Sequence, residues 1–240
     1  GNTRFDAAVT AASVTTDSLG TVSLNGGTIT TTGAQIYNDA MALGADTTLA
    51  TTNSTVNFGS ALDSDGATPR HLTVNTGNGD VQFASTVGAA KPLGNVAINS
   101  AGNTRFDGAV TAATVTTDSF GTLSLNGGAV TTSGAQTYND AVTLGANTTL
   151  TTTNSDVKLG SSLNSDATAP RSLTVSAGSG NVWFSSTVGI TNQLGDMAIN
   201  STGATRFDGG VKAASLTTDV GGSVLLNPAV SKRCTVMDAE

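Results

Sequence analysis

The sequence predicts an all-β fold, a parallel β-helix in which short strands stack coil upon coil. Three features predict it: internal repetition, a composition that favours strands, and turns spaced at coil length. Residues 1–101 recur as residues 102–202, with 67 of 101 aligned positions identical. A partial third unit covers residues 203–227, and residues 228–240 form a divergent tail. Such repetition is typical of solenoids, so we expect all units in one continuous stack.

Composition argues against helices and against several classes of protein. Aromatic residues make up 4% and charged residues 11% of the chain, both low for a globular domain. Apart from Glu240 the acids are all Asp, whereas Val and Thr, which favour strands, are abundant. The net charge is −7 and only Lys232 and Arg233 form a basic cluster, which excludes nucleic acid as a partner. The single cysteine, Cys234, cannot form an internal disulfide.

Strands and turns can be assigned in order along the unit. Alternating apolar runs at 22–24, 72–74 and 96–98 predict strands of three to five residues. Turns rich in Gly and Asn separate them. The aromatics recur at intervals of 32, 21, 25 and 23 residues, at positions 5, 37, 58, 83 and 106. We therefore expect about four coils per unit, nine to ten in the chain, a length of roughly 45 Å, and an internal column that includes Phe5, Phe58 and Phe83.

Three segments depart from this regularity. The 32-residue interval from Phe5 to Tyr37 holds either an additional coil, with Val22 and Leu24 as its core pair, or a loop. Residues 63–70 should protrude, because Pro69 cannot join a central ladder. The tail at 228–240 is either frayed or a short cap.

A different all-β architecture also has to be considered. Tandem immunoglobulin-like β-sandwiches have about 100 residues per domain, close to the repeat length. They predict a linker at each boundary, and no Pro-rich or charged linker marks one here. No apolar run approaches the roughly 20 residues of a membrane span, so we expect no membrane insertion. Because the first residue lies inside a repeat, we expect the chain to be part of a longer protein.

Acidic loops are the first candidate sites. Asp63 and Asp65 alternate as calcium ligands would, but the second unit has Asn164 and Asp166, and no Glu closes the loop. Residues 77–81 contain one copy of a Gly-x-Asp pattern that calcium-binding β-rolls repeat in tandem. We expect solvated Asx turns at both places rather than metal.

Three further features have bland explanations beside functional ones. The only histidine, His71, lacks a second ligand nearby and should face solvent. Trp183 alternates with Val182 and Phe184 and should point outward, where an indole can stack on a sugar or a partner. Because the first unit has Gln82 there, we favour an incidental exposed aromatic. An Arg precedes an Asp by two residues in all three units, which predicts an outward ladder along the axis, at Arg4, Arg105, Arg206, Asp6, Asp107 and Asp208.

An enzyme on this scaffold would need carboxylates that converge in one groove. The Asp residues are instead scattered and repeat with the unit. We expect no catalytic, cofactor-binding or metal site, no cofactor, and no enzymatic activity.

Three motifs resemble a known family. Thr-Arg-Phe-Asp-Gly-Ala-Val at 104–110, Gly-Ala-Gln-Thr-Tyr-Asn-Asp-Ala-Val at 134–142, and the related segments 79–87 and 180–188 are similar to repeats of filamentous-haemagglutinin-like bacterial adhesins. The resemblance covers about residues 1–227. It implies a right-handed parallel β-helix shaft, export to the bacterial surface, often by a two-partner route, and adhesion.

The sequence and this resemblance together give a functional expectation. We expect a non-catalytic shaft segment of a secreted or surface-displayed fibrous adhesin, which extends a binding tip from the bacterial cell surface. Its loops would contact host surfaces, glycans or abiotic surfaces, and its ends would self-associate. The alternative is a carbohydrate- or surface-binding module that uses the exposed Thr/Ser/Asn face or the loops. An unbroken Thr ladder would favour that alternative, whereas the strands mix Thr with Ser, Ala, Asn and Arg.

Overall fold

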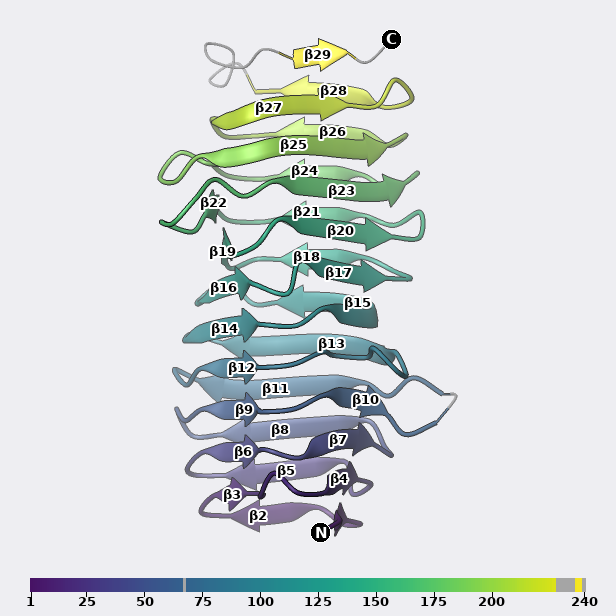
Figure 1. Cartoon of the computed structure of the whole chain (residues 1–240), viewed down its shortest axis with the longest axis vertical. Helices are drawn as coiled ribbons and strands as arrows, with labels where there is room; N and C mark the ends of the chain where they lie inside the picture. The colour runs from purple at the N-terminus through teal and green to yellow at the C-terminus, as the bar shows by residue number, and fades with distance from the viewer. Residues whose placement is uncertain (67, 228–235, 239–240) are drawn as a thin grey trace.

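A computed structural model describes residues 1–66, 68–227 and 236–238. The chain winds into a parallel β-solenoid of about 11 turns, and the described residues contain no helix. Figure 1 shows the strands stacked along the long axis, with the two termini at opposite ends. All pairings between described strands are parallel. The predicted parallel β-helix is confirmed.

The strands lie on three faces, and successive strands join these faces in rotation. The second sheet runs the whole length, whereas isolated bridges at Val87 connect β10 to β15 in the first, and isolated bridges at Val188 and Val211 continue the third beyond β22. The first sheet contains β1 (Thr3–Phe5), β4 (Thr21–Leu24), β7 (Ala40–Leu43), β10 (Leu62–Ser64), the first half of β15 (Val110–Thr117), β17 (Ala129–Thr132), β20 (Thr148–Thr152), β23 (Leu173–Gly178), β25 (Leu194–Ser201), β27 (Ala213–Thr218) and β29 (Val236–Asp238). The second contains β2 (Val9–Ala11), β5 (Thr28–Thr31), β8 (Thr47–Thr51), β11 (Leu72–Gly77), β13 (Leu93–Ser100), the second half of β15, β18 (Gln136–Tyr138), β21 (Val157–Leu159), β24 (Val182–Phe184), β26 (Ala204–Phe207) and β28 (Ser223–Leu226). The third contains β3 (Val14–Thr15), β6 (Gln35–Tyr37), β9 (Val56–Phe58), β12 (Val81–Phe83), β14 (Asn103–Phe106), β16 (Thr122–Leu125), β19 (Ala141–Leu144) and β22 (Leu163–Ser165).

The expected nine to ten coils are corrected to about 11. The extra turn lies in the 32-residue interval, where Leu24 stacks directly on Phe5 in the first sheet. Val22 and Leu24 are both buried, so the interval holds an additional coil without an aromatic rather than a loop. At about 4.8 Å per turn, 11 turns span about 53 Å.

The sequence repeat does not match a whole number of turns. Counted through the ladders, Phe106 lies fourteen sheet positions after Phe5, so one unit makes four and two-thirds turns. Phe5 is therefore in the first sheet, Phe106 in the third and Phe207 in the second. Equivalent residues of the three units face three different directions.

This change of face means that the expected Arg–Asp ladder along the axis is wrong. Each Arg pairs with the Asp two residues later, at 2.9 Å from Arg4, 2.8 Å from Arg105 and 2.6 Å from Arg206. The three pairs lie on three different sheets, so none stacks on another. They are local, solvent-exposed ion pairs, which contribute little to stability.

Stacked aromatic rings fill one corner of the interior. Tyr37, Phe58, Phe83 and Phe106 form a continuous stack in the third sheet, with centroids 5.8, 4.6 and 4.8 Å apart. The expected column of Phe58 and Phe83 is thus confirmed, but Phe5 belongs to another sheet. In the second unit Leu159 replaces Phe58, so only Phe184 and Phe207 stack, at 4.7 Å.

A buried amide supports each tyrosine of this stack. Gln35 is fully buried, and its Nε2 donates to the carbonyls of Ala50 (2.9 Å) and Ile29 (3.1 Å). The hydroxyl of Tyr37 donates to Gln35 Oε1 at 2.9 Å. Burial raises the pKa of Tyr37 above its ordinary value, which keeps the hydroxyl protonated as this bond requires. Gln136 and Tyr138 repeat the arrangement in the second unit.

Three further expectations concern the alternative fold, the tail and a membrane span. Tandem sandwiches are wrong, because they need antiparallel strands, and because β12 pairs with β14 across the boundary between units. The tail prediction lies outside the described residues, except that β29 pairs with β27. The described residues contain no helix long and apolar enough to cross a membrane.

The two aromatic stacks allow a matched stability test. Phe83 contacts a ring on both sides, whereas Phe184 contacts a ring on one side only. We expect Phe83→Ala to lower the free energy of unfolding by about 3–5 kcal/mol. Phe184→Ala should cost about 0.5–1.5 kcal/mol less, the value of one aromatic pair. Denaturant titration followed by circular dichroism measures both, and equal losses would show that ring stacking adds nothing beyond burial.

Candidate functional site

The corners of the solenoid use Asp and Asn side chains as backbone acceptors. Asp63 Oδ1 accepts from the backbone N–H of Ala90 (2.9 Å) and Lys91 (3.0 Å), one turn further along. Asn164, its counterpart in the second unit, accepts from Thr191 (3.1 Å) and Asn192 (3.2 Å). An amide oxygen serves as well as a carboxylate in this role, so the position fastens the next turn in both units.

The Gly-x-Asp segment follows the same rule. Asp80 Oδ1 accepts from the N–H of Asn103 at 2.8 Å. In the second unit Asn181 accepts from Ala204 at 2.9 Å. Among the described residues no group of three or more His, Cys, Asp or Glu side chains gathers as a metal site would require.

The loop after β22 is held by an ion pair. Arg171 donates from Nη2 to Asp166 Oδ2 at 2.9 Å and from Nε to Oδ1 at 3.3 Å. The Thr168 hydroxyl adds a bond of 2.9 Å to the same carboxylate. Hydrogen bonds from Arg171 and Thr168 hold the pKa of Asp166 well below its ordinary value of 3.8. The loop also borders a shallow hollow of about 220 Å³, lined with polar groups from Asn192 and Gln193.

The corresponding loop of the first unit is held more loosely. Arg70 Nε lies 3.6 Å from Asp65 Oδ1. Figure 1 shows this loop, after β10, projecting on the opposite side from the loop after β22. The two acidic loops are therefore not brought together into one site.

His71 is exposed, as expected, and connects two turns. Its Nδ1 accepts from the backbone N–H of Asn95 at 2.7 Å, so this nitrogen carries no proton. Its own backbone N–H donates to Asp46 Oδ1 at 3.0 Å. Ser172 takes the same place in the second unit, where its Oγ accepts from the backbone N–H of Asp196 at 3.1 Å. The side chain closes a corner of the fold.

Two buried carboxylates anchor the turns that precede β4 and β16. Asp39 accepts from the N–H of Gly20 at 2.7 Å, and Asp140 from that of Gly121 at 2.8 Å. Both carboxylates are buried. Burial raises the pKa of Asp140, and the nearby Asp118 adds to the shift. Each anchored turn exposes an apolar side chain at its tip, Leu19 or Phe120.

Trp183 points outward, as expected, between two cations. Its neighbours in the ladder are Lys158 on β21 and Arg206 on β26. Leu225 on β28 follows in the same column and is 60% exposed. The sequence alone could not place these residues side by side, because they lie 25 and 23 positions apart and belong to two units.

Outward threonines form columns, which the sequence did not predict. On the second sheet Thr28, Thr48 and Thr73 stack in register, followed by Ala97, Thr116 and Thr137. A second column beside them contains Thr10, Thr30, Ala50, Asn75 and Asn99. The second unit repeats the pattern on the first sheet, at Thr111, Thr131, Thr151, Ser176, Asn200, Ala129, Thr149, Thr174, Ala198 and Thr217. We call these residues the threonine arrays.

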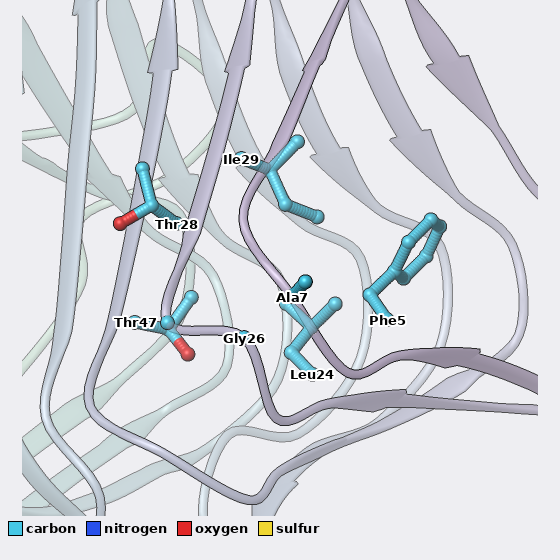
Figure 2. A pocket seen from close by; sticks show the side chains of 8 residues that line it. Phe5, Ala7, Leu24, Gly26, Thr28, Ile29 and Thr47 are labelled. Carbon is cyan, nitrogen blue, oxygen red and sulfur yellow. The ribbon is translucent and has the colours of Figure 1, made fainter.

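A gap beneath the first turn is a packing defect rather than a binding site. Figure 2 shows it bordered by Phe5, Leu24 and Ile29, with Thr28 and Thr47 on the other side. The space is too narrow for a water molecule.

The Asp166 loop predicts a specific pH dependence. Because folding lowers the pKa of Asp166, the ion pair stabilises the protein above the ordinary value of 3.8, and this contribution is lost as the pH falls through the lower, folded-state pKa. We expect Arg171→Ala to lower the melting temperature at pH 7 and to lower it less at pH 2, where the Asp166 carboxyl of the unfolded chain is protonated.

Arg70→Ala is the matched control, because its partner Asp65 is 3.6 Å away. We expect a smaller loss at pH 7 from this variant. A loss for Arg171→Ala that is equal at both pH values would contradict an ionic role for Asp166.

Comparison of this chain with protein-family models, curated proteins and solved structures gave no match.

Proposed function

We propose that this chain is a shaft segment of a fibrous protein displayed on a bacterial surface. The observation that carries the proposal is the unbroken parallel ladder of the second sheet. From β2 to β28 the second sheet has one strand in every turn. A rod built this way has no internal joint at which it bends or opens.

The interactions in the solenoid suit a mechanical role. Each turn contacts only its neighbours, so stability grows with the number of turns. Gln35 and Gln136 tie adjacent turns together inside the core, while Asp and Asn side chains do so at the corners. A protease would find few unpaired backbone segments apart from the loops.

The mismatch between unit and turn also suits a surface fibre. Because each unit makes four and two-thirds turns, equivalent loops of successive units point to different sides of the rod. Asp63 precedes a loop that leaves the first sheet, and Asn164 precedes one that leaves the third. A shaft of this kind presents its loops in several directions.

The finer parts of the proposal rest on the resemblance to filamentous-haemagglutinin-like adhesins. They are extracellular display, adhesion through a separate tip, the absence of catalysis, and contact with host, glycan or abiotic surfaces through the loops. Immunolabelling of intact bacteria with an antibody against this chain tests display, and labelling only after lysis would contradict it.

End-to-end association is part of the proposal. Phe5 and Val9 of the first turn are half-buried, whereas their counterparts Phe106 and Val110 are buried beneath neighbouring turns. In a sample of these 240 residues alone, a second copy stacked on the first turn would cover these side chains.

Duplication of one unit tests the shaft directly. We expect small-angle scattering from the chain to fit a rod about 53 Å long, and insertion of a second copy of residues 102–202 to add about 22 Å without a joint. A flexible, two-part particle would contradict the proposal. A rod twice the expected length that shortens on dilution would show end-to-end association.

A second candidate function is supported by the threonine arrays. Their positions repeat at about 4.8 Å along the axis and about 6.7 Å along each strand, and they contain no charged residue. Such a flat, uncharged lattice suits an insoluble, uncharged polysaccharide. The columns include Ala and Asn, so the lattice is more regular than the sequence suggests but is not all threonine.

Charge insertion tests this candidate. We expect the Thr48→Arg/Thr149→Arg double variant, with one charge in each array, to reduce co-sedimentation with microcrystalline cellulose or chitin at least tenfold. Thr143→Arg is the control, because Thr143 faces outward from the third sheet, beyond both arrays. No sedimentation of the wild-type chain with either polymer, or equal losses in both variants, would contradict the candidate.

A further inference from the structure

The outward column of the second sheet near its C-terminal end is chemically unlike the rest of the rod. Lys158, Trp183 and Arg206 occupy three consecutive rungs, so about 10 Å separates the two cationic positions, with the indole between them. The chain contains one Trp and ten Lys and Arg residues, and its net charge is −7. Two of those few cations therefore flank the only indole.

Most hydrogen-bond donors on these three side chains have no acceptor among the described residues. Lys158 forms no ion pair with any described residue, and the indole N–H of Trp183 donates to none of them. Arg206 uses Nε to bind Asp208 at 2.6 Å, and its Nη atoms donate to no described residue. Its side chain is 52% exposed. Asp208 accepts from Arg206 Nε only, so a ligand would have to supply acceptors for the remaining donors.

The backbone beneath the column is rigid. Val157 and Leu159 flank Lys158, Val182 and Phe184 flank Trp183, and all four side chains are buried. Phe184 also stacks on Phe207, which follows Arg206. The backbone positions of the three outward residues are thus fixed in order and spacing before any ligand binds, so binding requires no rearrangement of the backbone.

The first unit contains a corresponding column with different residues at two of the three rungs. There Asn57, Gln82 and Arg105 form the matching rungs on the third sheet. Gln82 Nε2 donates to Asp107 at 3.0 Å, so the middle rung of that column finds its acceptor within the protein. In the second unit Lys158 stands in place of Asn57, and Trp183 in place of Gln82. A cation and an aromatic ring thus replace two neutral amides.

We propose that Lys158, Trp183 and Arg206 form a binding site for an acidic glycan. A sugar ring packs its apolar face on the indole, while carboxylate or sulfate groups on it or on the adjacent sugars bind Lys158 and Arg206. Two cations on an acidic chain are too few to hold a nucleic acid backbone. A lipid surface would need a wider basic or apolar face than this single column.

The sole tryptophan makes the site directly observable. The probes are a heparin-derived hexasaccharide, which carries sulfates, a galacturonate hexamer, which carries only carboxylates, and the neutral cellohexaose. We expect at least one acidic probe to change the Trp183 emission in a saturable way, and more weakly at higher salt. The two acidic probes distinguish sulfate from carboxylate recognition. No change with either of them at millimolar concentration, or an equal change with cellohexaose, would overturn the proposal.

Exchange with the first unit provides the variants. Lys158→Asn and Trp183→Gln place in the second unit the residues that the first unit already carries at these rungs, so both should fold. Titration calorimetry should show at least a tenfold loss of affinity for the acidic probe in each. Phe120→Leu, another exchange between units and one that alters an aromatic 77% exposed in a different turn, should leave binding unchanged. Unchanged binding in Lys158→Asn would overturn the proposal.

The reverse exchange tests sufficiency. Asn57→Lys/Gln82→Trp recreates the column beside Arg105 on the third sheet. We expect the number of bound acidic hexasaccharides to rise from one to two, with similar affinities. A stoichiometry that stays at one, in a variant with wild-type circular dichroism, would overturn the proposal. Scattering by the same variants shows whether the rod persists, so failure of this site is distinguishable from failure of the shaft.

Discussion

The structure depends above all on the parallel backbone ladder between consecutive turns. A single turn of this chain buries little, and its strands of two to eight residues would not be stable alone. Stacking pairs the backbone of each strand with the turns on both sides and lines up inward side chains into shared columns. Each turn is stabilised by its neighbours, which is why a chain with 4% aromatic residues encloses a continuous core.

The same constraint explains the unusual choice of polar residues. At the corners a turn has backbone N–H groups that no strand partner accepts, and an Asp or Asn of the adjacent turn accepts them. Positions 63 and 164, and positions 80 and 181, do so with Asp in one unit and Asn in the other. In both side chains the accepting oxygen is bonded to Cγ, which lets it reach the backbone N–H groups of the neighbouring turn. The near absence of Glu and the spread of Asp along the chain have the same cause.

Divergence between the units shows where the fold is permissive. Most inward positions that differ between the units stay within the apolar class, as from Phe58 to Leu159, although the buried Thr76 becomes Ala177. At an outward position Gln82 has Trp183 as its counterpart. An outward side chain on a solenoid is constrained by its two ladder neighbours and by solvent, so new chemistry can be introduced there without disturbing the core. The proposed glycan site and the threonine arrays both use this freedom.

The sequence by itself determined the solenoid, its short strands and the outward direction of Trp183, because a period of two and a repeated unit act locally along the chain. It also located the additional coil in the interval from Phe5 to Tyr37, although it left a loop as the alternative. Only the tertiary structure decided the register, and with it the four and two-thirds turns per unit. Register depends on how many residues each corner consumes, a quantity set by packing against neighbouring turns. Because one unit makes four and two-thirds turns, Phe5 lies outside the aromatic stack and the three Arg–Asp pairs lie on different sheets. The same register places Lys158 and Arg206 on either side of Trp183.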